Sequence, residues 1–320
     1  MKTRKLRELN VSAIGLGCMG FSHGYGPAPE RNESVRLIRR AFDMGCDFFD
    51  TAEVYGAGDN ELIVGEALKP LRQKVTLATK LHIPDDNDKP LNVVIRDHLD
   101  ASLKRLQTDY VDLYYQHRVN KNIPVEAVAE CMGELIKEGK IRGWGQSQAT
   151  EQEIRRAHAV TPITAIQSEY SMMERMFEKD VIPACEELGI GFVSFSPLAS
   201  GFLSGKYNTE SVFTGDDVRK GITRYSKESI HANQPLLDLL NEYAGQKQVT
   251  AAQISLAWML HKNDFIVPIP GMRSEARFIE NFAAVDIELS EQEFGSIEDA
   301  LSRIDIHGNR TDEDIAKLYE

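Results

Sequence analysis

Short runs of β-forming residues alternate with longer segments of helical periodicity along almost the whole chain. A helical segment follows each run, and this order predicts parallel strands joined by helical crossovers. Each run is five or six residues long, which is a usual strand length. The predicted strands span residues 12–17, 47–51, 75–79, 111–116, 142–147, 164–168, 191–196 and 265–269.

Two of the helical segments show the period most clearly, and each has a single apolar stripe. The stripes are formed by Leu91, Val94, Ile95, Leu99, Leu103 and Leu106, and by Val125, Val128, Ala129, Met132, Leu135 and Ile136. A helix with one apolar stripe covers one face of a sheet. Eight strand–helix units in unbroken order favour a closed (β/α)8 TIM barrel of the α/β class, because closure leaves no strand edge exposed.

Three further segments add to this barrel. Residues 3–10 predict a short N-terminal β-hairpin that plugs the bottom of the ring. The stretch 199–229 is too long for an ordinary loop, so we expect a functional flap over the top of the seventh strand. Ser290 and Glu293 form a capping box that starts an extra C-terminal helix. No linker or repeat divides the chain, which predicts one domain over residues 1–320.

Composition and charge narrow the possible partners. Apolar residues make up 42% of the 320 residues and charged residues 27%, which is typical of a folded, soluble protein. The net charge of −12 opposes binding to the phosphates of nucleic acids, and we expect no nucleic-acid partner. No apolar run approaches the roughly 20 residues that a membrane-spanning helix needs.

The cysteines and the N-terminal sequence indicate the cellular compartment of the protein. Cys18, Cys46, Cys131 and Cys185 lie far apart and form no CxxC pair, and the first residues lead into polar sequence rather than an apolar signal core. We therefore expect a cytoplasmic protein with reduced thiols.

Two glycine-rich segments resemble nucleotide-binding motifs, and neither is expected to act as one. Residues 15–20 match GxGxxG, but the fingerprint needs a helix to follow, and Gly24, Gly26, Pro27 and Pro29 prevent one from starting there. A tight turn at the barrel rim is the better interpretation. Residues 201–206 fall one residue short of a P-loop and lack its Ser or Thr.

Polar residues follow three adjacent predicted strands at the end where a TIM barrel places its reactive groups. Asp50 ends the second strand, with Tyr55 five residues further on, while Lys80 follows the third strand and His117 the fourth. Each residue alone has an ordinary explanation, such as a turn cap, a surface lysine or packing at the rim. Their occurrence together favours a functional site.

These four side chains suit the protonation of a carbonyl oxygen. A free tyrosine has a pKa of about 10, and a neighbouring lysine ammonium lowers that pKa by stabilising the phenolate. Asp50 would hold Lys80, and His117 would either relay a proton or orient the carbonyl; both roles remain open. No side chain supplies the electron pair for reduction, so a hydride donor must bind nearby.

The same residues belong to a series of motifs in a fixed order. The segments are 14–17 (IGLG), 50–56 (DTAEVYG), 78–80 (ATK), 110–113 (YVDL) with His117, 141–143 (IRG), 167–170 (QSEY), 196–198 (SPL) and 280–281 (EN). From Leu9 to Ala284 the chain resembles the aldo-keto reductase superfamily. The resemblance implies an NADP-dependent oxidoreductase on a (β/α)8 barrel, with Tyr55 as the general acid supported by Lys80, Asp50 and His117.

The resemblance also implies NADPH or NADP+ as cofactor and residues that hold its nicotinamide. Ser147, Gln148 and Gln167 correspond to the residues that bind the carboxamide, although the family usually has Asn where this chain has Gln148. Phe195 corresponds to the aromatic residue that stacks on the nicotinamide ring. Two alternatives stay open: Ser147 as the N-cap of a helix starting near Glu151, and Phe195 as ordinary packing.

Further cofactor contacts follow from the same resemblance. Arg273 and Arg277 correspond to the site of the 2′-phosphate, with scattered surface charge as the alternative. The flap residues lie where the family binds the pyrophosphate. The remaining implied contacts are Met19, Ser196, Pro197, Leu198, Gly201, Lys206, Gly271, Glu280 and Asn281.

The expected substrate is a small carbonyl compound, either an aldehyde, a ketone or a quinone. Its pocket is expected to include Phe21, His23, Tyr25, Tyr55, His307 and Arg310. A different class, a non-catalytic regulatory subunit like the β subunits of potassium channels, fits the same four residues. A metal-dependent hydrolase is not expected, because Asp50 and His117 do not form a set of metal ligands. The pattern does not predict an oligomeric state.

Overall fold

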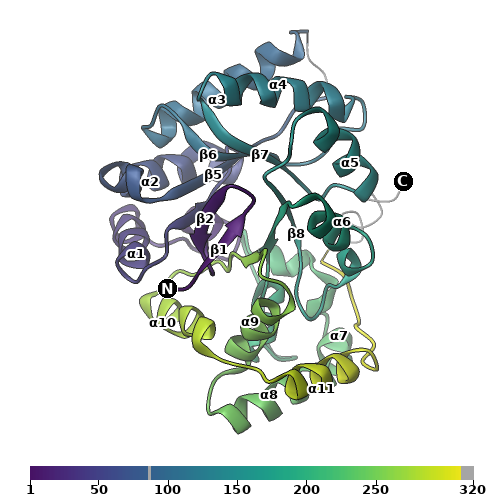
Figure 1. Ribbon diagram of the computed structural model, residues 1–320. Helices are drawn as coiled ribbons and strands as arrows, with labels where there is room; N and C mark the ends of the chain where they lie inside the picture. Colours follow the sequence, from purple (N-terminus) through teal and green to yellow (C-terminus); the bar gives the residue numbers. More distant parts are fainter. Residues whose placement is uncertain (86–87, 311–320) are drawn as a thin grey trace.

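Eight parallel strands form a ring surrounded by helices in the computed structural model, which describes residues 1–85 and 88–310 (Figure 1). Each strand pairs with its neighbours in chain order. The predicted (β/α)8 barrel is thereby confirmed. The strands are β3 (Leu16–Gly17), β4 (Phe48–Asp50), β5 (Thr76–Leu81), β6 (Val111–Gln116), β7 (Ile141–Ser147), β8 (Ala165–Glu169), β9 (Gly191–Phe195) and β10 (Ile266–Pro268).

Hydrogen bonds between the first and last segments close the ring. The amide of Gly15 donates to the carbonyl of Pro268 at 3.0 Å, and that of Gly17 donates to Pro270 at 3.3 Å. A Cβ atom at Gly17 would lie 2.8 Å from the carbonyl oxygen of Ile269. Glycine therefore allows the close approach that joins the two edges.

The prediction for residues 12–17 was only partly right. Only Leu16 and Gly17 belong to the ring, whereas Ser12 ends a strand of the N-terminal hairpin. The Ser12 hydroxyl donates to the carbonyl of Ile14, and its amide donates to Asp47, so the chain turns here instead of continuing as one strand. The other seven predicted strands match the observed ones to within two residues at either end.

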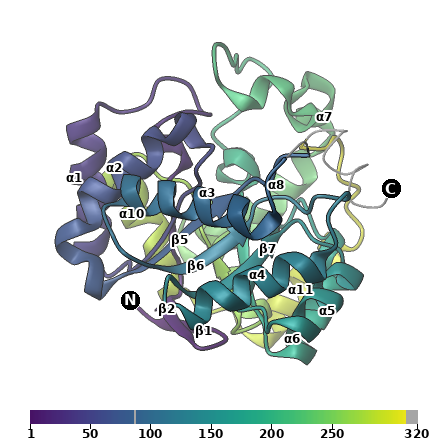
Figure 2. The same cartoon turned by 90° about the horizontal axis from the view of Figure 1, so that it is seen from above.

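The expected hairpin closes one end of the barrel. Strands β1 (Thr3–Leu6) and β2 (Leu9–Ser12) pair in antiparallel register. Leu6 and Val11 are fully buried and pack with the inward-facing residues of the ring, including Leu113 and Val193. Figure 2 shows the hairpin at the lower edge of the molecule and α7 (Lys227–Ala232) at the upper edge.

The predicted helices at residues 91–106 and 125–136 are present as α3 and α4, and each buries its apolar stripe. Ser290 caps α11 through the expected capping box. No helix in the described ranges is long and apolar enough to cross a membrane. The remaining bounds are α1 (Arg31–Asp43), α2 (Asp59–Leu68), α3 (Leu91–Leu106), α4 (Val125–Lys137), α5 (Glu151–Val160), α6 (Val181–Leu188), α8 (Gln234–Lys247), α9 (Ala251–Lys262), α10 (Glu275–Phe282) and α11 (Glu291–Leu301).

The segment expected to form a flap, residues 199–229, follows β9, contains short 3₁₀ turns and ends within α7. The rejected GxGxxG motif opens no α-helix, since α1 begins only at Arg31, although a single 3₁₀ turn does form at Met19–Phe21. Both segments lie at the carboxyl end of the strands. Residues 86–87 and 311–320 of the expected domain lie outside the described residues.

Candidate active site

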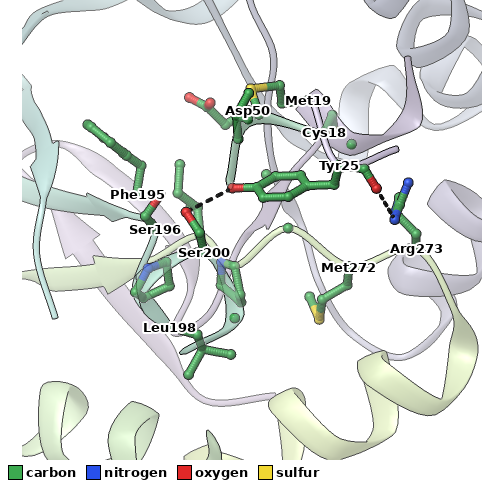
Figure 3. Close-up of a pocket in the computed structure, with 18 of the residues that line it drawn as sticks. Cys18, Met19, Tyr25, Asp50, Phe195, Ser196, Leu198, Ser200, Met272 and Arg273 are labelled. Atoms are coloured by element: carbon green, nitrogen blue, oxygen red, sulfur yellow. Dashed lines mark hydrogen bonds between the residues drawn. The ribbon is translucent and has the colours of Figure 1, made fainter. Parts of the chain in front are cut away.

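A cavity of about 560 Å³ opens at the carboxyl end of the strands, where residues of the ring meet the flap and the segment after β10 (Figure 3). Among the described lining residues Asp50 is the one acidic side chain. The lysines and arginines that line it are Arg118, Lys206, Arg219, Arg273, Arg277 and Arg310. A chain of net charge −12 thus has a strongly basic cavity.

Lys80 and Asp50 form a buried ion pair at the floor of this cavity. The Lys80 ammonium donates to Asp50 and, at 2.8 Å, to the carbonyl of Thr51, while the amide of Gln167 donates to the second Asp50 oxygen at 2.8 Å. Burial lowers the pKa of Lys80, but the attraction of Asp50 and Tyr55 outweighs it and raises this pKa overall. Lys80 is therefore a fixed positive charge.

Tyr55 lies directly against this ammonium. Its hydroxyl is 3.5 Å from Lys80 Nζ, and its ring makes an edge contact with His117 at 5.8 Å between centroids. Tyr55, His117 and Asp50 line the cavity, and Lys80 is buried behind them. The structure thus brings the four residues singled out from the sequence into one group.

His117 is a neutral imidazole near pH 7. Burial lowers its pKa well below the ordinary value, and the positive charges of Lys80, Arg118 and Arg310 lower it further. The backbone amide of His117 donates to the carbonyl of Leu81 at 2.8 Å, which fixes the residue beside the end of β5. A neutral ring offers one N–H donor to a ligand but carries no extra proton.

Three residues expected near the nicotinamide, Ser147, Gln167 and Phe195, line the cavity. The alternative interpretation of Ser147 as a helix cap is wrong, because Thr150 caps α5. Gln148 does not line the cavity; its side-chain oxygen instead accepts a hydrogen bond from the amide of Glu169 at 3.3 Å.

The expected pyrophosphate residues just before the flap and at its start all line the cavity; they are Ser196, Pro197, Leu198, Gly201 and Lys206. The backbone here is unusual, since Ser196, Ala199 and Ser200 have φ values of 48°, 47° and 56°. Such left-handed conformations are costly for residues other than glycine and tend to occur at functional sites. The Tyr225 hydroxyl supports this turn by donating to the carbonyl of Ser200 at 2.9 Å.

The residues expected around the adenosine phosphate divide into two groups. Met19, Gly271, Arg273, Arg277 and Asn281 line the cavity, whereas Glu280 does not. Glu280 accepts a hydrogen bond from Arg277. Arg273 donates to the carbonyls of Tyr25 and Pro27 at 2.9 and 3.0 Å. Both arginines thus have protein partners, which the sequence did not predict.

Tyr25 joins the two loops that face each other across the cavity. Its hydroxyl donates to Ser200 at 3.3 Å while its carbonyl accepts from Arg273, as Figure 3 shows. Nearby, the amide of Val218 donates to the carbonyl of Gly24 at 2.9 Å, and the amide of Gly24 donates to Asp216 at 3.1 Å. The flap is thereby fastened to the loop after β3.

The residues expected in the substrate pocket are only partly brought together. Tyr25, Tyr55 and Arg310 line the cavity, but Phe21, His23 and His307 are absent from its lining. Phe21 is buried in the core.

Sequence reasoning missed several lining residues, notably Arg118, Ser200, Tyr207 and Arg219. Two of these had a signal in the sequence, since Arg118 directly follows His117 and Arg219 is a cation within the flap. Within residues 1–85 and 88–310, no group of three or more His, Cys, Asp or Glu side chains is arranged to hold a metal ion. All four cysteines are free thiols.

Comparisons with known proteins agree on one family. The model of the aldo/keto reductase family matches residues 13–302. A probable aldo-keto reductase 1 from Glycine max is 40% identical over 306 residues, which cover 94% of this chain and 88% of that protein. A glycerol dehydrogenase from Gluconobacter oxydans has a TM-score of 0.85 at 26% identity, covering 94% of this chain and 95% of that one. An aldo/keto reductase from Klebsiella pneumoniae, solved in complex with NADP and acetate, has a TM-score of 0.74 at 28% identity, covering 96% and 100%.

Proposed function

The chain belongs to the aldo/keto reductase family, and we propose that it reduces the carbonyl group of small aldehydes and ketones to an alcohol with NADPH. The observation that carries this proposal is the Tyr55 hydroxyl, which lies 3.5 Å from the Lys80 ammonium at the wall of the cavity. A relative solved with NADP supports the choice of cofactor.

The residues present fit such a cofactor. The side-chain oxygen of Asn281 is buried and has no hydrogen-bond partner among the described residues, although Asn281 lines the cavity. A buried acceptor of this kind favours a ligand that donates to it, and the amino group of adenine has that chemistry. Phe195 offers a ring face to the nicotinamide, and Ser147 and Gln167 offer polar groups to its carboxamide.

The basic residues fit the phosphates of NADPH. A guanidinium has five N–H groups, so Arg273 and Arg277 keep donors for a phosphate while they hold the protein partners described above. Lys206 lines the cavity beside the strained turn of the flap. When bound, NADPH supplies the hydride that the side chains of this chain cannot supply.

In the proposed mechanism Tyr55 donates its hydroxyl proton to the carbonyl oxygen of the substrate. The ammonium of Lys80 stabilises the negative charge that develops on the Tyr55 oxygen. Asp50 and the carbonyl of Thr51 hold Lys80 in place.

The N–H of the neutral His117 donates a hydrogen bond to the same carbonyl oxygen and orients it toward Tyr55. Because its pKa lies well below the ordinary value, we assign His117 the orienting role rather than that of a proton source.

Steady-state oxidation of NADPH with a panel of aldehydes and ketones tests the proposal. We expect turnover that requires the carbonyl compound and yields the alcohol in equal amount to the NADPH consumed. Binding of NADPH without turnover of any carbonyl compound would contradict the proposed activity and would favour a regulatory, non-catalytic role.

A further inference from the structure

Two arginines stand at the end of the cavity that holds Tyr55 and His117, and the mechanism above uses neither of them. Arg118 directly follows His117 after β6, and Arg310 comes from the segment beyond α11. Both line the cavity. They are separated along the chain by 192 residues (310 − 118), so the fold and not local sequence places them together.

Two of the contacts of Arg118 at the cavity wall are with neutral acceptors. Its guanidinium donates to the carbonyl of His117 at 2.6 Å and to the Ser147 hydroxyl at 3.2 Å. These two bonds direct one edge of the planar group toward the protein. A guanidinium has five donors, and both of these bonds come from the same nitrogen, Nη1.

The segment before Arg310 is clamped to the barrel. The amide and carbonyl of His307 both bond to the side chain of Asn233 at 2.9 Å, and the amide of Asn309 donates to the Thr223 hydroxyl at 2.7 Å. Gly308 has a φ of 78°, and a Cβ there would lie 2.6 Å from the amide nitrogen of Arg224. These contacts place Arg310 at the cavity.

The guanidinium of Arg310 has defined neighbours at that point. It lies 4.8 Å from the centroid of the Phe195 ring and 3.9 Å from Glu169. Glu169 is in turn bound by the buried Arg224 at 2.9 Å. Arg310 therefore lies beside the Phe195 ring, which we expect to stack on the nicotinamide.

Both arginines contribute to the electric field at the reaction centre. Burial is the main cause of the low pKa of His117, and the charges of Lys80, Arg118 and Arg310 add to it in the same direction. The phosphates of NADPH do not account for this end of the cavity, since the residues assigned to them are Lys206, Arg273 and Arg277. Arg118 and Arg310 thus add positive charge to the cavity beyond the residues assigned to the cofactor phosphates.

Building on the proposed carbonyl reduction, we propose that the preferred substrates carry an anionic group, a carboxylate or a phosphate, which Arg118 and Arg310 bind while Tyr55 and His117 hold the carbonyl. Guanidinium groups match both anions because their N–H donors form parallel pairs of hydrogen bonds. Arg118 and Arg310 are thereby residues that determine specificity and are not required for the proton transfer itself.

Three aldehydes of similar size test this proposal: 4-carboxybenzaldehyde, 4-formylphenyl phosphate and the neutral methyl 4-formylbenzoate. The readout is the ratio of kcat/KM for each anionic aldehyde to that for the ester, because a general loss of activity cancels in the ratio. We expect a ratio of about 10 or more for at least one anion, consistent with charge-assisted hydrogen bonds. The two anionic arms distinguish a carboxylate from a phosphate. Added salt should lower the ratio, because it screens the charges.

Substitutions then assign the preference to the two arginines. Arg118→Met and Arg310→Met should each lower the ratio about tenfold, and Arg118→Lys should lower it less because it keeps the charge. Arg303→Met is the matched control, since Arg303 is exposed in the same C-terminal region and does not line the cavity. We expect its ratio to equal that of the wild type.

The outcomes separate this proposal from the proposed function. Reduction of all three aldehydes with ratios near one, or ratios that neither methionine variant changes, would overturn the anionic preference and leave carbonyl reduction intact. If none of the three aldehydes, nor any in the wider panel, is reduced, the proposed function itself fails, and the substrate preference fails with it.

Discussion

At the end of the cavity that holds Tyr55, Asp50, Lys80 and His117 stand at the ends of neighbouring strands, whereas at the end that holds Arg273 the polar side chains stand on loops that meet across the opening. Asp50 is the last residue of β4 and Lys80 lies near the end of β5. Strand register fixes such positions relative to one another. At the other end, Tyr25 and Ser200 are held together by a single hydrogen bond at 3.3 Å.

This difference indicates a division of work. The strand end presents a buried, charge-paired group suited to proton transfer, which depends on distances being held closely. The loop end presents several basic groups on segments that meet across the cavity, which suits a large anionic ligand. We therefore expect substitutions at the two ends to affect different steps.

The largest effect is expected for Tyr55→Phe. Removing the hydroxyl removes the acid that protonates the carbonyl oxygen, and general acid catalysis contributes about 10²- to 10⁴-fold. We expect kcat to fall within that range and the Kd of NADPH to change by less than about threefold. Steady-state kinetics and a fluorescence titration measure the two quantities. A variant that keeps more than a third of the wild-type kcat would remove Tyr55 from the mechanism.

Lys80→Met should also reduce kcat severely, because the phenolate loses its neighbouring charge. The substitution leaves Asp50 buried without its ion-pair partner, and breaking a buried pair typically costs about 3–5 kcal/mol of stability. Thermal unfolding and kcat should both be measured.

Asp50→Asn should lower kcat less than Lys80→Met does, because Asp50 acts on the reaction through Lys80. The opposite order, with Asp50→Asn inactive and Lys80→Met close to wild type, would contradict this arrangement.

At the loop end, Arg277→Ala should weaken NADPH binding by about ten- to a hundredfold, because charge-assisted hydrogen bonds contribute roughly 1.5–3 kcal/mol. NADH lacks the 2′-phosphate, so its Kd should hardly change. Arg273→Ala should have the same selectivity and should also loosen the loop that Arg273 holds through Tyr25. Fluorescence titrations at one ionic strength measure these constants. Equal losses for both coenzymes would mean that the arginines do not recognise the phosphate.

A smaller effect is expected in the pH dependence of stability. The pKa of His117 is lowered in the folded protein, so the unfolded chain binds a proton that the folded chain does not as the pH falls through about 6.5. His117 therefore favours unfolding at low pH, by at most about 1.4 kcal/mol at pH 5.5. Urea unfolding of wild type and His117→Gln at pH 7.5 and 5.5 isolates this contribution. The variant should lose less stability than the wild type between the two pH values; an equal loss would show that His117 titrates normally.

The sequence predicted the site residues best where a strand fixes their positions. The order of strands and helices gave the barrel, and the rule that reactive groups follow barrel strands picked out Asp50, Lys80 and His117. The first strand was placed too early because Ser12 has a strand-like context, and its hydrogen bonds to Ile14 and Asp47 cannot be read from that context.

The long-range hydrogen-bond partners at the loop end could not be predicted from the sequence for the same reason. Arg273 bonds to Tyr25 and Pro27, which are more than 240 residues away along the chain. Gln148, which replaces the usual Asn, and Glu280 stand at family positions, but their side chains contact Glu169 and Arg277 instead. A motif identifies a residue type at a position, while the direction of its side chain depends on the loops around it.

The division of work between the two ends is tested most directly by measuring two quantities in the same preparations of Tyr55→Phe and Arg277→Ala. One is the Kd of NADPH, and the other is the single-turnover rate of NADPH oxidation by an aldehyde at saturating NADPH. We expect Tyr55→Phe to lower the rate about a hundredfold or more with little change in Kd, and Arg277→Ala to raise Kd about tenfold or more with little change in rate. If both variants changed both quantities to a similar extent, the two ends would not act separately and the account would be contradicted.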